Sequence, residues 1–435
     1  MSRTAPQSEP AADRPVDPEV AVDPDYAFSP VPRTARRGFW SVGFVLLGFT
    51  FFSASMSVGA KLGTGLDLSG FLTAVLLGGL FLAVYTGALA YVGARTGLGM
   101  DLIARRAFGT TGSYLPSALI SLTQMGWFGV GVAMFAIPTS EIIGTSPWIV
   151  VLLGGAAMTA SAYFGIKAIE IVSFVSVPLI ALLGTWSMVT ATNDAGGLAQ
   201  VFGASGGMPL LTGIALVIGS FISGGTATPN FTRFASTPGS AVVTTVVAFL
   251  LGNALMFGFG AVGGAFTGKD DIFYVMIAQG LALPAIIVLG ANIWTTNNNA
   301  LYSSGLGFAN ITNAPRRPLV LVAGFVGTLL AMWLYDNFVG WLTFLSAALP
   351  PVGAIFIADF VRHREHYLAA DGVARPLHGV HVGAVVGVVA GGLVGILVPA
   401  GVPSINAMVV ALVCWFVGDL VQGGRPAGAT TRAGV

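Results

Sequence analysis

The sequence predicts an all-helical integral membrane protein with twelve transmembrane helices. Apolar residues make up 55% of the 435 residues and charged residues only 9%, whereas a soluble domain carries roughly 25% charge. Long charge-free runs recur along the chain, and the basic residues alternate between the loops that join them. This composition excludes a soluble enzyme, and a net charge of +1 gives no field that favours nucleic acid.

The spans are counted from the stretches that contain no charged residue. These stretches cover residues 38–60, 68–94, 107–140, 142–166, 171–193, 195–232, 234–268, 272–315, 318–335, 337–358 and 376–418. A helix needs about 20 apolar residues to cross the hydrocarbon core of a bilayer. Ten stretches therefore hold one span each, and the last, which Pro399 and Pro403 interrupt, holds two.

The basic residues predict the orientation of these spans. Outside the N-terminal tail, 15 Lys and Arg residues lie in loops of one parity, and only Lys61 and Lys269 lie in loops of the other. The positive-inside rule then places both termini in the cytoplasm. It also limits the long run 272–315 to one crossing, because an even number would put Arg316 and Arg317 outside.

The two ends of the chain differ from the spans. Residues 1–32 are rich in Pro, Asp and Glu without apolar periodicity, which is typical of a disordered tail and not of a signal peptide. We expect a second cytoplasmic tail at 423–435. After the tenth span, His363 and His366 stand at helical spacing, and we interpret them as part of a solvated cytoplasmic loop and not as a metal site.

Neutral polar residues gather within three of the spans. They are Gln124 and Trp127 in the third span, Ser220, Phe221 and Ser223 in the glycine-rich segment of the sixth, and Asn292, Thr295 and Thr296 in the eighth. Polar groups at that depth are expensive unless they are satisfied. No acidic residue lies at the middle of a span, so we interpret the three clusters as one site for an uncharged solute. The alternative is close helix packing through small residues, with the amides bonding between helices.

The positions of the clusters indicate an internal repeat. Spans one to five (38–193) and six to ten (208–358) form two blocks of five, followed by two further helices (377–422). The third and eighth spans hold the same place in their blocks, and the first and sixth both contain Gly beside Phe and small residues. Five is odd, so the blocks have opposite orientation. Inverted repeats with broken first helices and a site at their interface are typical of secondary transporters.

Six stretches of the sequence resemble the nucleobase:cation symporter-1 family, in particular its cytosine-transporting members. These stretches are residues 31–38, 50–56, 124–138, 219–226, 293–302 and 338–351. The resemblance implies a LeuT-like fold, in which a five-plus-five inverted repeat is followed by two C-terminal helices. It also implies a location in the bacterial inner membrane and a monomer as the functional unit.

The resemblance further implies the residues of the site. The base would stack between Trp127 and Phe221, with Gln124, Ser220, Ser223 and Asn292 along its polar edge. A sodium ion would be held by the hydroxyls of Thr295 and Thr296 and the carbonyls of Asn292, Gly48 and Phe51. Flat bases stack well on aromatic rings, and amides offer both a donor and an acceptor without a charge.

The leading hypothesis from the sequence is a sodium-coupled importer of cytosine that needs no other cofactor. Another neutral ring, such as a hydantoin, allantoin, uracil or a purine, remains open as the substrate, and so does a proton as the coupling ion. A membrane sensor or channel on the same fold is a further alternative. An enzyme is disfavoured, because no nucleophile–base pair or cluster of metal ligands occurs within the spans.

Overall fold

The computed structural model describes residues 26–164, 166–368 and 379–423, and these residues are helical apart from connecting loops and one isolated bridge between Arg37 and Ala235. Long apolar runs become helices because a helix satisfies its own backbone polar groups where no water is available. The first half contains α1 (Phe39–Thr50), α2 (Ser53–Gly65), α3 (Leu68–Thr96), α4 (Met100–Phe108), α5 (Tyr114–Ile143), α6 (Pro147–Tyr163), α7 (Ile166–Asp194) and α8 (Leu198–Val201).

The second half continues the same architecture. It contains α9 (Leu210–Thr226), α10 (Pro229–Thr232), α11 (Pro238–Val247), α12 (Asn253–Thr267), α13 (Ile272–Ala278), α14 (Ala282–Pro284), α15 (Gly290–Thr312), α16 (Arg316–Asp336), α17 (Phe338–Ala348), α18 (Pro350–Arg362), α19 (Arg364–Leu368), α20 (Val382–Leu397) and α21 (Pro403–Gly423). Two π-helical turns, at Ala248–Gly252 and Ala285–Leu289, precede α12 and α15.

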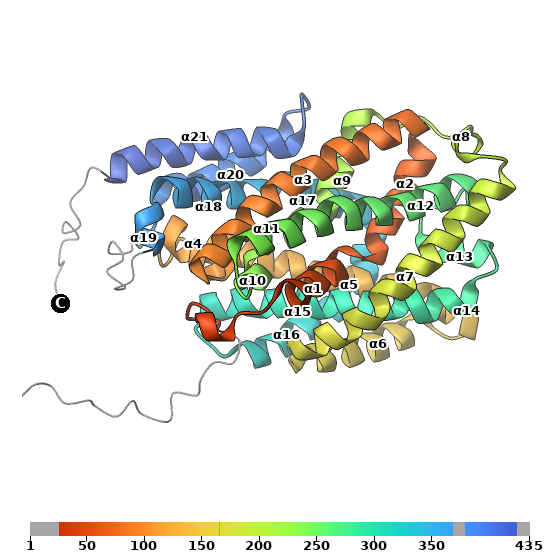
Figure 1. The fold of residues 1–435 in the computed structure, drawn as a ribbon, viewed down its shortest axis with the longest axis horizontal. Helices are drawn as coiled ribbons and strands as arrows, with labels where there is room; N and C mark the ends of the chain where they lie inside the picture. The colour runs from red at the N-terminus through yellow and green to blue at the C-terminus, as the bar shows by residue number, and fades with distance from the viewer. Residues whose placement is uncertain (1–25, 165, 369–378, 424–435) are drawn as a thin grey trace, which may run out of the picture.

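The protein is an all-helical membrane protein. Within the described residues, seven helices are long and apolar enough to cross a membrane, or eight if the bent pair α1 and α2 forms one span. The apolar helices α6 and α20 are shorter, and the long helix α15 carries several Asn and Thr residues. In Figure 1 the long helices run side by side, with α4 and α19 at one end of the bundle and α8, α13 and α14 at the other. We call these the α4 end and the α13 end.

The first span is broken, as the sequence predicts. Helices α1 and α2 meet at an angle of 47°. The amide of Phe52 donates to the carbonyl of Thr50 (2.9 Å) and not to that of Gly48, so the carbonyl of Gly48 loses its helical donor. The π-helical turn Ala248–Gly252 lies against this break, where a Cβ on Gly252 would stand 2.8 Å from the hydroxyl of Thr50.

The sixth span differs from the prediction, because it is not broken at its glycines. Helix α9 runs through the glycine-rich segment without interruption and ends at Thr226, before the short helix α10. The glycines allow close packing instead: a Cβ at Gly219 would stand 2.6 Å from the carbonyl of Leu342, and one at Gly225 would stand 2.9 Å from Thr86. This matches the packing alternative for that segment.

Helices α2 and α12 lie in backbone contact. A Cβ at Gly59 or Gly63 would overlap the backbone of α12, and one at Gly260 would overlap the backbone of α2. A Cβ at Gly264 would stand 2.6 Å from the Cα of Ala60. Only glycine permits this approach along both helices.

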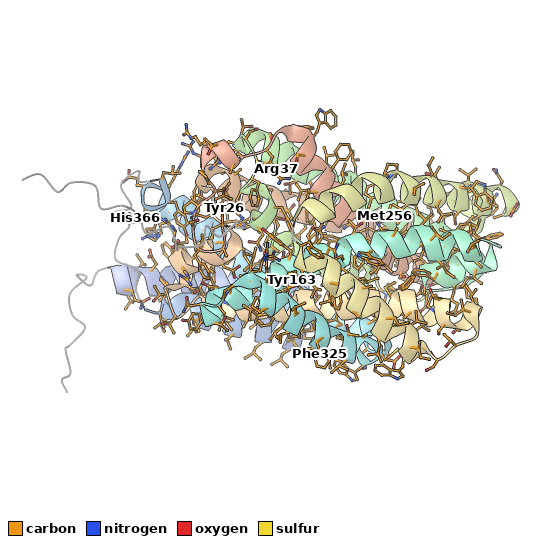
Figure 2. All side chains as sticks on the ribbon, turned by 90° about the horizontal axis from the view of Figure 1, so that it is seen from below. Tyr26, Arg37, Tyr163, Met256, Phe325 and His366 are labelled. Carbon is orange, nitrogen blue, oxygen red and sulfur yellow. The ribbon has the colours of Figure 1, made fainter. Side chains whose placement is uncertain are left out.

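The segment before α1 packs on the bundle. The predicted tail lies outside the described residues as far as residue 25, but Val31 is only 2% exposed and its amide donates to the carbonyl of Gly97 (2.9 Å). Arg36 donates to the carbonyl of Ala94, and the amide of Arg37 donates to the carbonyl of Phe234. Residues 26–37 therefore tie the end of α3 to the segment after α10. Figure 2 places Tyr26 and His366 toward the same end of the molecule.

Candidate substrate and ion sites

A narrow, largely filled cavity lies among α1, α5, α9 and α15, at the break of the first span. It is lined by Phe49, Phe52, Gln124, Trp127, Ser220, Phe221, Ser223, Gly224, Thr296, Asn297 and Ala300. The lining contains aromatic, amide and hydroxyl groups and no charged side chain. Such a lining suits a neutral ring with a polar edge.

Two aromatic walls bound the cavity. Trp127 on α5 contacts Phe52 and Phe338, with ring centroids 5.7 and 6.0 Å apart and the rings nearly perpendicular. Phe221 on α9 contacts Phe49 at 5.1 Å and Phe249 at 5.2 Å, again nearly perpendicular. Edge-to-face pairs of this kind fix the orientation of each ring. Trp127 and Phe221 are thus held on different helices of the same cavity.

Two fully buried polar atoms of the lining residues have no hydrogen-bond partner among the described residues. They are Nε2 of Gln124, a donor, and Oδ1 of Asn297, an acceptor. Both side chains are 1% exposed, and the other end of the Asn297 amide donates to the carbonyl of Phe128 (3.2 Å). A buried polar atom without a partner costs about 1–3 kcal/mol, which a solute of matching pattern can relieve.

Asn292 does not line the cavity. Its Oδ1 accepts from the amide and from the hydroxyl of Ser53, both at 2.9 Å, and its Nδ2 donates to the carbonyl of Phe51. The side chain therefore braces the break between α1 and α2. From the resemblance we expected the Asn292 side chain to contact the polar edge of the base. In the structure, the residues of α15 that line the cavity with polar side chains are Thr296 and Asn297.

The predicted sodium ligands lie on α15 and at the break of the first span. The hydroxyls of Thr295 and Thr296 donate back along α15, to the carbonyls of Ala291 (3.1 Å) and Asn292 (3.3 Å). A hydroxyl that donates its proton still presents oxygen lone pairs to a cation. The Phe51 carbonyl is bonded by Asn292, which ties the break to α15, and the Gly48 carbonyl lacks its helical donor. No group of three or more His, Cys, Asp and Glu side chains that could hold a metal occurs in the described residues.

The two ends of the cavity are closed differently. Toward the α13 end, the ring of Phe338 contacts Trp127 and also lines a second cavity of about 230 Å³, together with Lys61, Asp270, Asp271 and other residues. The ion pair between Lys61 and Asp270 (2.5 Å) stands in this outer cavity. Phe338 thus lies between the two cavities.

Toward the α4 end the closure is longer. The ring of Phe231 lies 5.1 Å from Phe49 and 6.3 Å from Tyr302, and the buried Arg233 donates to the Tyr302 hydroxyl (3.3 Å). Arg233 also donates to the carbonyl of Tyr26 (2.7 Å). The N-terminal segment thus completes a closure several residues deep.

The sequence predicts about half of the residues that line the cavity and misses the others. Five of the six predicted substrate residues line the cavity, Asn292 being the exception. Phe49, Phe52, Gly224, Asn297 and Ala300 were not among the predicted substrate residues. The aromatic run of the first span and the Asn run after Thr296 are visible signals in the sequence, but only the packing decides which of these side chains face the solute.

A family described as permeases for cytosine/purines, uracil, thiamine and allantoin matches residues 30–418. The chain belongs to this family. Members of this permease family are transporters and not enzymes, and the resemblance noted from the sequence is thereby confirmed.

Individual relatives agree with this membership. A cytosine permease of Escherichia coli (strain K12) is 53% identical over 347 residues, which cover 79% of this chain and 83% of that protein. Mhp1, a nucleobase-cation-symport-1 family transporter solved in a closed conformation with bromovinylhydantoin bound, superimposes with a TM-score of 0.78 at 20% identity and covers 92% of this chain and 96% of its own. A Na⁺-coupled sialic acid symporter matches at a TM-score of 0.66 and 14% identity, over 89% and 90% of the two chains. The permease thus has the Mhp1 fold.

Proposed function

We propose that this permease imports cytosine by sodium-coupled alternating access. The observation that supports this most directly is the cavity itself, whose lining residues include two aromatic walls and two amides, each with a buried polar atom that lacks a partner among the described residues. The relative with 53% identity bears the name cytosine permease. A neutral base needs no charged partner, and the cavity lining has none.

In this proposal the base stacks between Trp127 and Phe221. Stacking is worth roughly 1–3 kcal/mol per base. Gln124 donates from Nε2 to the carbonyl or ring nitrogen of cytosine, and Asn297 accepts from its amino group through Oδ1. Ser220, Ser223 and Thr296 serve the remaining polar atoms. Asn292 acts on the base indirectly, by holding the break of the first span against α15.

We assign the sodium ion to the carbonyls of Gly48, Phe51 and Asn292 and the hydroxyls of Thr295 and Thr296. A hard cation prefers oxygen ligands, and a broken helix frees carbonyls to provide them. Asn292 touches both sides of this site, because its side chain binds the break while its carbonyl belongs to α15. The Na⁺-coupled symporter of the same fold supports this choice of ion.

For the topology we propose twelve crossings. They are the seven long apolar helices, the bent pair α1 and α2, the shorter helices α6 and α20, and α7 and α15. Residues 38–193 and 208–358 form inverted repeats, and residues 377–422 contribute the last two helices. The basic loops support an orientation with the α4 end and both termini in the cytoplasm of a bacterial cell. We propose that one chain is the transporting unit.

The test is uptake of radiolabelled cytosine into proteoliposomes, with unlabelled cytosine, uracil, adenine, allantoin and hydantoin as competitors, with and without a sodium gradient. We expect only cytosine to compete strongly, because uracil presents a carbonyl where cytosine presents an amino group. A site matched to one pattern leaves buried groups unpaired with the other. Equal competition by uracil would contradict the proposed reading of the amino group by Asn297.

Another neutral ring is the second candidate, because the family description names several substrates and Mhp1 was solved with bromovinylhydantoin bound. The same competition panel identifies it, as the compound that displaces the label best. Uptake that follows a proton gradient and ignores sodium would overturn the choice of ion while leaving the solute assignment intact.

A further inference from the structure

A cluster of acidic and histidine side chains joins the inner end of α18 to α21, away from the substrate cavity. Asp359 on α18 and Asp419 on α21 are each 5% exposed. His363, at the C-terminus of α18, lies between them. Its Nδ1 is 3.0 Å from Oδ1 of Asp359 and its Nε2 is 3.4 Å from Oδ1 of Asp419. The sequence suggested a solvated loop here, but the side chain of His363 is only 17% exposed.

This placement depends on the charge of the imidazole. A neutral histidine has one N–H and one nitrogen that can only accept. Either neutral tautomer of His363 would therefore set a nitrogen lone pair against a carboxylate oxygen. The imidazolium presents an N–H on both sides, so the protonated side chain hydrogen-bonds to Asp359 and pairs by charge with Asp419. The protonated side chain therefore bridges α18 and α21, and the neutral one does not.

The remaining atoms of the two carboxylates are already used. Oδ2 of Asp359 accepts from the hydroxyl of Tyr367 (2.6 Å), and Oδ2 of Asp419 accepts from Nε of Arg362 (2.5 Å). Burial and the neighbouring Asp359 raise the pKa of Tyr367 well above its ordinary value, so its hydroxyl keeps its proton. Arg362 is always charged. His363 is thus the member of the cluster whose charge changes near neutral pH.

Other titratable and charged groups surround the cluster. They are Arg364, Glu365 and His366 on α19, His381 at the start of α20, Arg106 on α4 and Tyr91 on α3. His381 approaches Asp419 at 4.0 Å, and its Nδ1 accepts from the amide of Ala384 at the start of α20. Among the described residues, His363 alone has ring nitrogens within 4 Å of both Asp359 and Asp419.

We propose that His363 is a proton-controlled clamp, which fastens the inner end of α18 to α21 when its imidazole is protonated and loosens this contact when the imidazole loses its proton. The loss removes the cation from between Asp359 and Asp419, and of the two only Asp419 keeps an arginine partner, Arg362, among the contacts described above. Removing the charged partner of a buried carboxylate is strongly unfavourable. On the orientation proposed above, this face meets the cytoplasm. The clamp itself does not depend on that orientation or on the identity of the solute.

The experiment measures the thermal unfolding midpoint of the purified permease in detergent between about pH 5 and about pH 8, the range over which histidine changes charge. A cation that the folded state stabilises contributes most at low pH, and its contribution is lost as the pH rises. We expect the midpoint of the wild type to fall by several degrees across this range. His363→Gln should flatten this fall, and the two proteins should converge at the alkaline end.

Three further variants make the result specific. His366→Gln removes the neighbouring imidazole, which stacks on His363 without bridging the carboxylates, and should keep the wild-type pH profile. His363→Lys keeps a positive charge throughout and should flatten the profile while retaining more stability than His363→Gln at the alkaline end. Asp419→Asn removes one carboxylate and serves if His363→Gln does not fold; it too should flatten the profile. A pH profile of His363→Gln or Asp419→Asn that parallels the wild type overturns the proposal.

Discussion

Trp127 and Phe221 form the aromatic part of the proposed solute contact, so replacing either residue should lower the affinity for cytosine. Trp127→Ala removes a ring that is 5% exposed and held between Phe52 and Phe338. We expect cytosine affinity to fall by roughly 5- to 150-fold, the equivalent of about 1–3 kcal/mol of stacking. Phe221→Tyr should retain part of the affinity, because it keeps the ring. Isothermal calorimetry on purified protein measures both.

The control for this prediction is Trp333→Ala. Trp333 lies on α16 with 61% of its surface exposed and is not part of the cavity lining. Its removal should leave cytosine affinity unchanged. Wild-type affinity in Trp127→Ala would place the solute elsewhere.

Asp101 gives a separate prediction at the residue scale, about stability and pH. It lies on α4, outside the apolar spans, and accepts from the hydroxyl of Ser117 (2.6 Å). Burial raises the pKa of its carboxyl to about 6. An acid whose pKa is raised on folding stabilises the protein when protonated, so this contribution is lost as the pH rises from about 4 to about 6.

Asp101→Asn should remove that loss, which amounts to about 3 kcal/mol. The unfolding midpoint of the variant should change less between pH 4 and 6 than that of the wild type. Asp194→Asn is the matched control, because Asp194 is exposed at the end of α7. Parallel profiles for Asp101→Asn and the wild type would mean that the carboxyl does not titrate in this range.

Several residues of the site were predictable from type and spacing. Gln124 and Trp127 share one face of a helix, and five of the predicted solute residues line one cavity. The position of the Asn292 side chain was not predictable. It bonds to Ser53 at the break of the first span, 239 positions earlier in the chain, and the sequence does not show that these two segments meet. The same holds for Oδ1 of Asn297. This oxygen is left without a partner among the described residues because Nδ2 of the same amide turns toward the carbonyl of Phe128 on α5.

At the scale of elements, α15 joins the proposed solute and ion sites. Thr296 lines the cavity and is also a proposed sodium ligand. Removing both hydroxyls in Thr295→Ala with Thr296→Ala should abolish the sodium dependence of cytosine binding and leave weaker binding through the aromatic walls. In the wild type, bound sodium should raise the affinity for cytosine by roughly 5- to 150-fold, and bound cytosine should raise the affinity for sodium by the same factor. Cytosine titrations at several sodium concentrations measure this coupling.

Thr312→Ala is the control on the same helix. The hydroxyl of Thr312 also donates one turn back, to the carbonyl of Phe308 (2.8 Å), but it lies at the far end of α15 from the break of the first span. The variant should keep the sodium dependence. An unchanged dependence in the double variant would mean that these hydroxyls only bond to their own helix.

The elements themselves were predictable to different degrees. The charge-free runs predicted the long helices, because backbone N–H and C=O groups in lipid must form their hydrogen bonds within the helix. The continuity of α9 was not foretold, since glycine serves both a break and a close contact, and only the neighbours Leu342 and Thr86 distinguish the two. The packing of residues 26–37 was also missed, because it is made by backbone bonds to Gly97 and Phe234 that leave no pattern in the sequence.

At the scale of the molecule, the two ends of the cavity are closed by different numbers of residues. The ring of Phe338 lies between this cavity and the second cavity at the α13 end, whereas Phe231, Tyr302, Arg233 and the N-terminal segment close the α4 end. In the proposed alternating access, both closures open in turn. The first needs movement of one helix end, and the second needs several hydrogen bonds to break together.

The glycine contact between α2 and α12 has a mechanical consequence for this movement. Two helices whose backbones touch over this length cannot slide or roll past one another without collision. We therefore expect α2 and α12 to move as a single lever that pivots at the break after α1. Spin labels at the ends of α2 and α12, in a background with Cys414 replaced by serine, should report one distance in every combination of sodium and cytosine. A pair of labels on α2 and α16 should report a distance that changes. If the first distance also changes, the lever bends, and the hinge of the transport cycle lies within the glycine contact and not at the break.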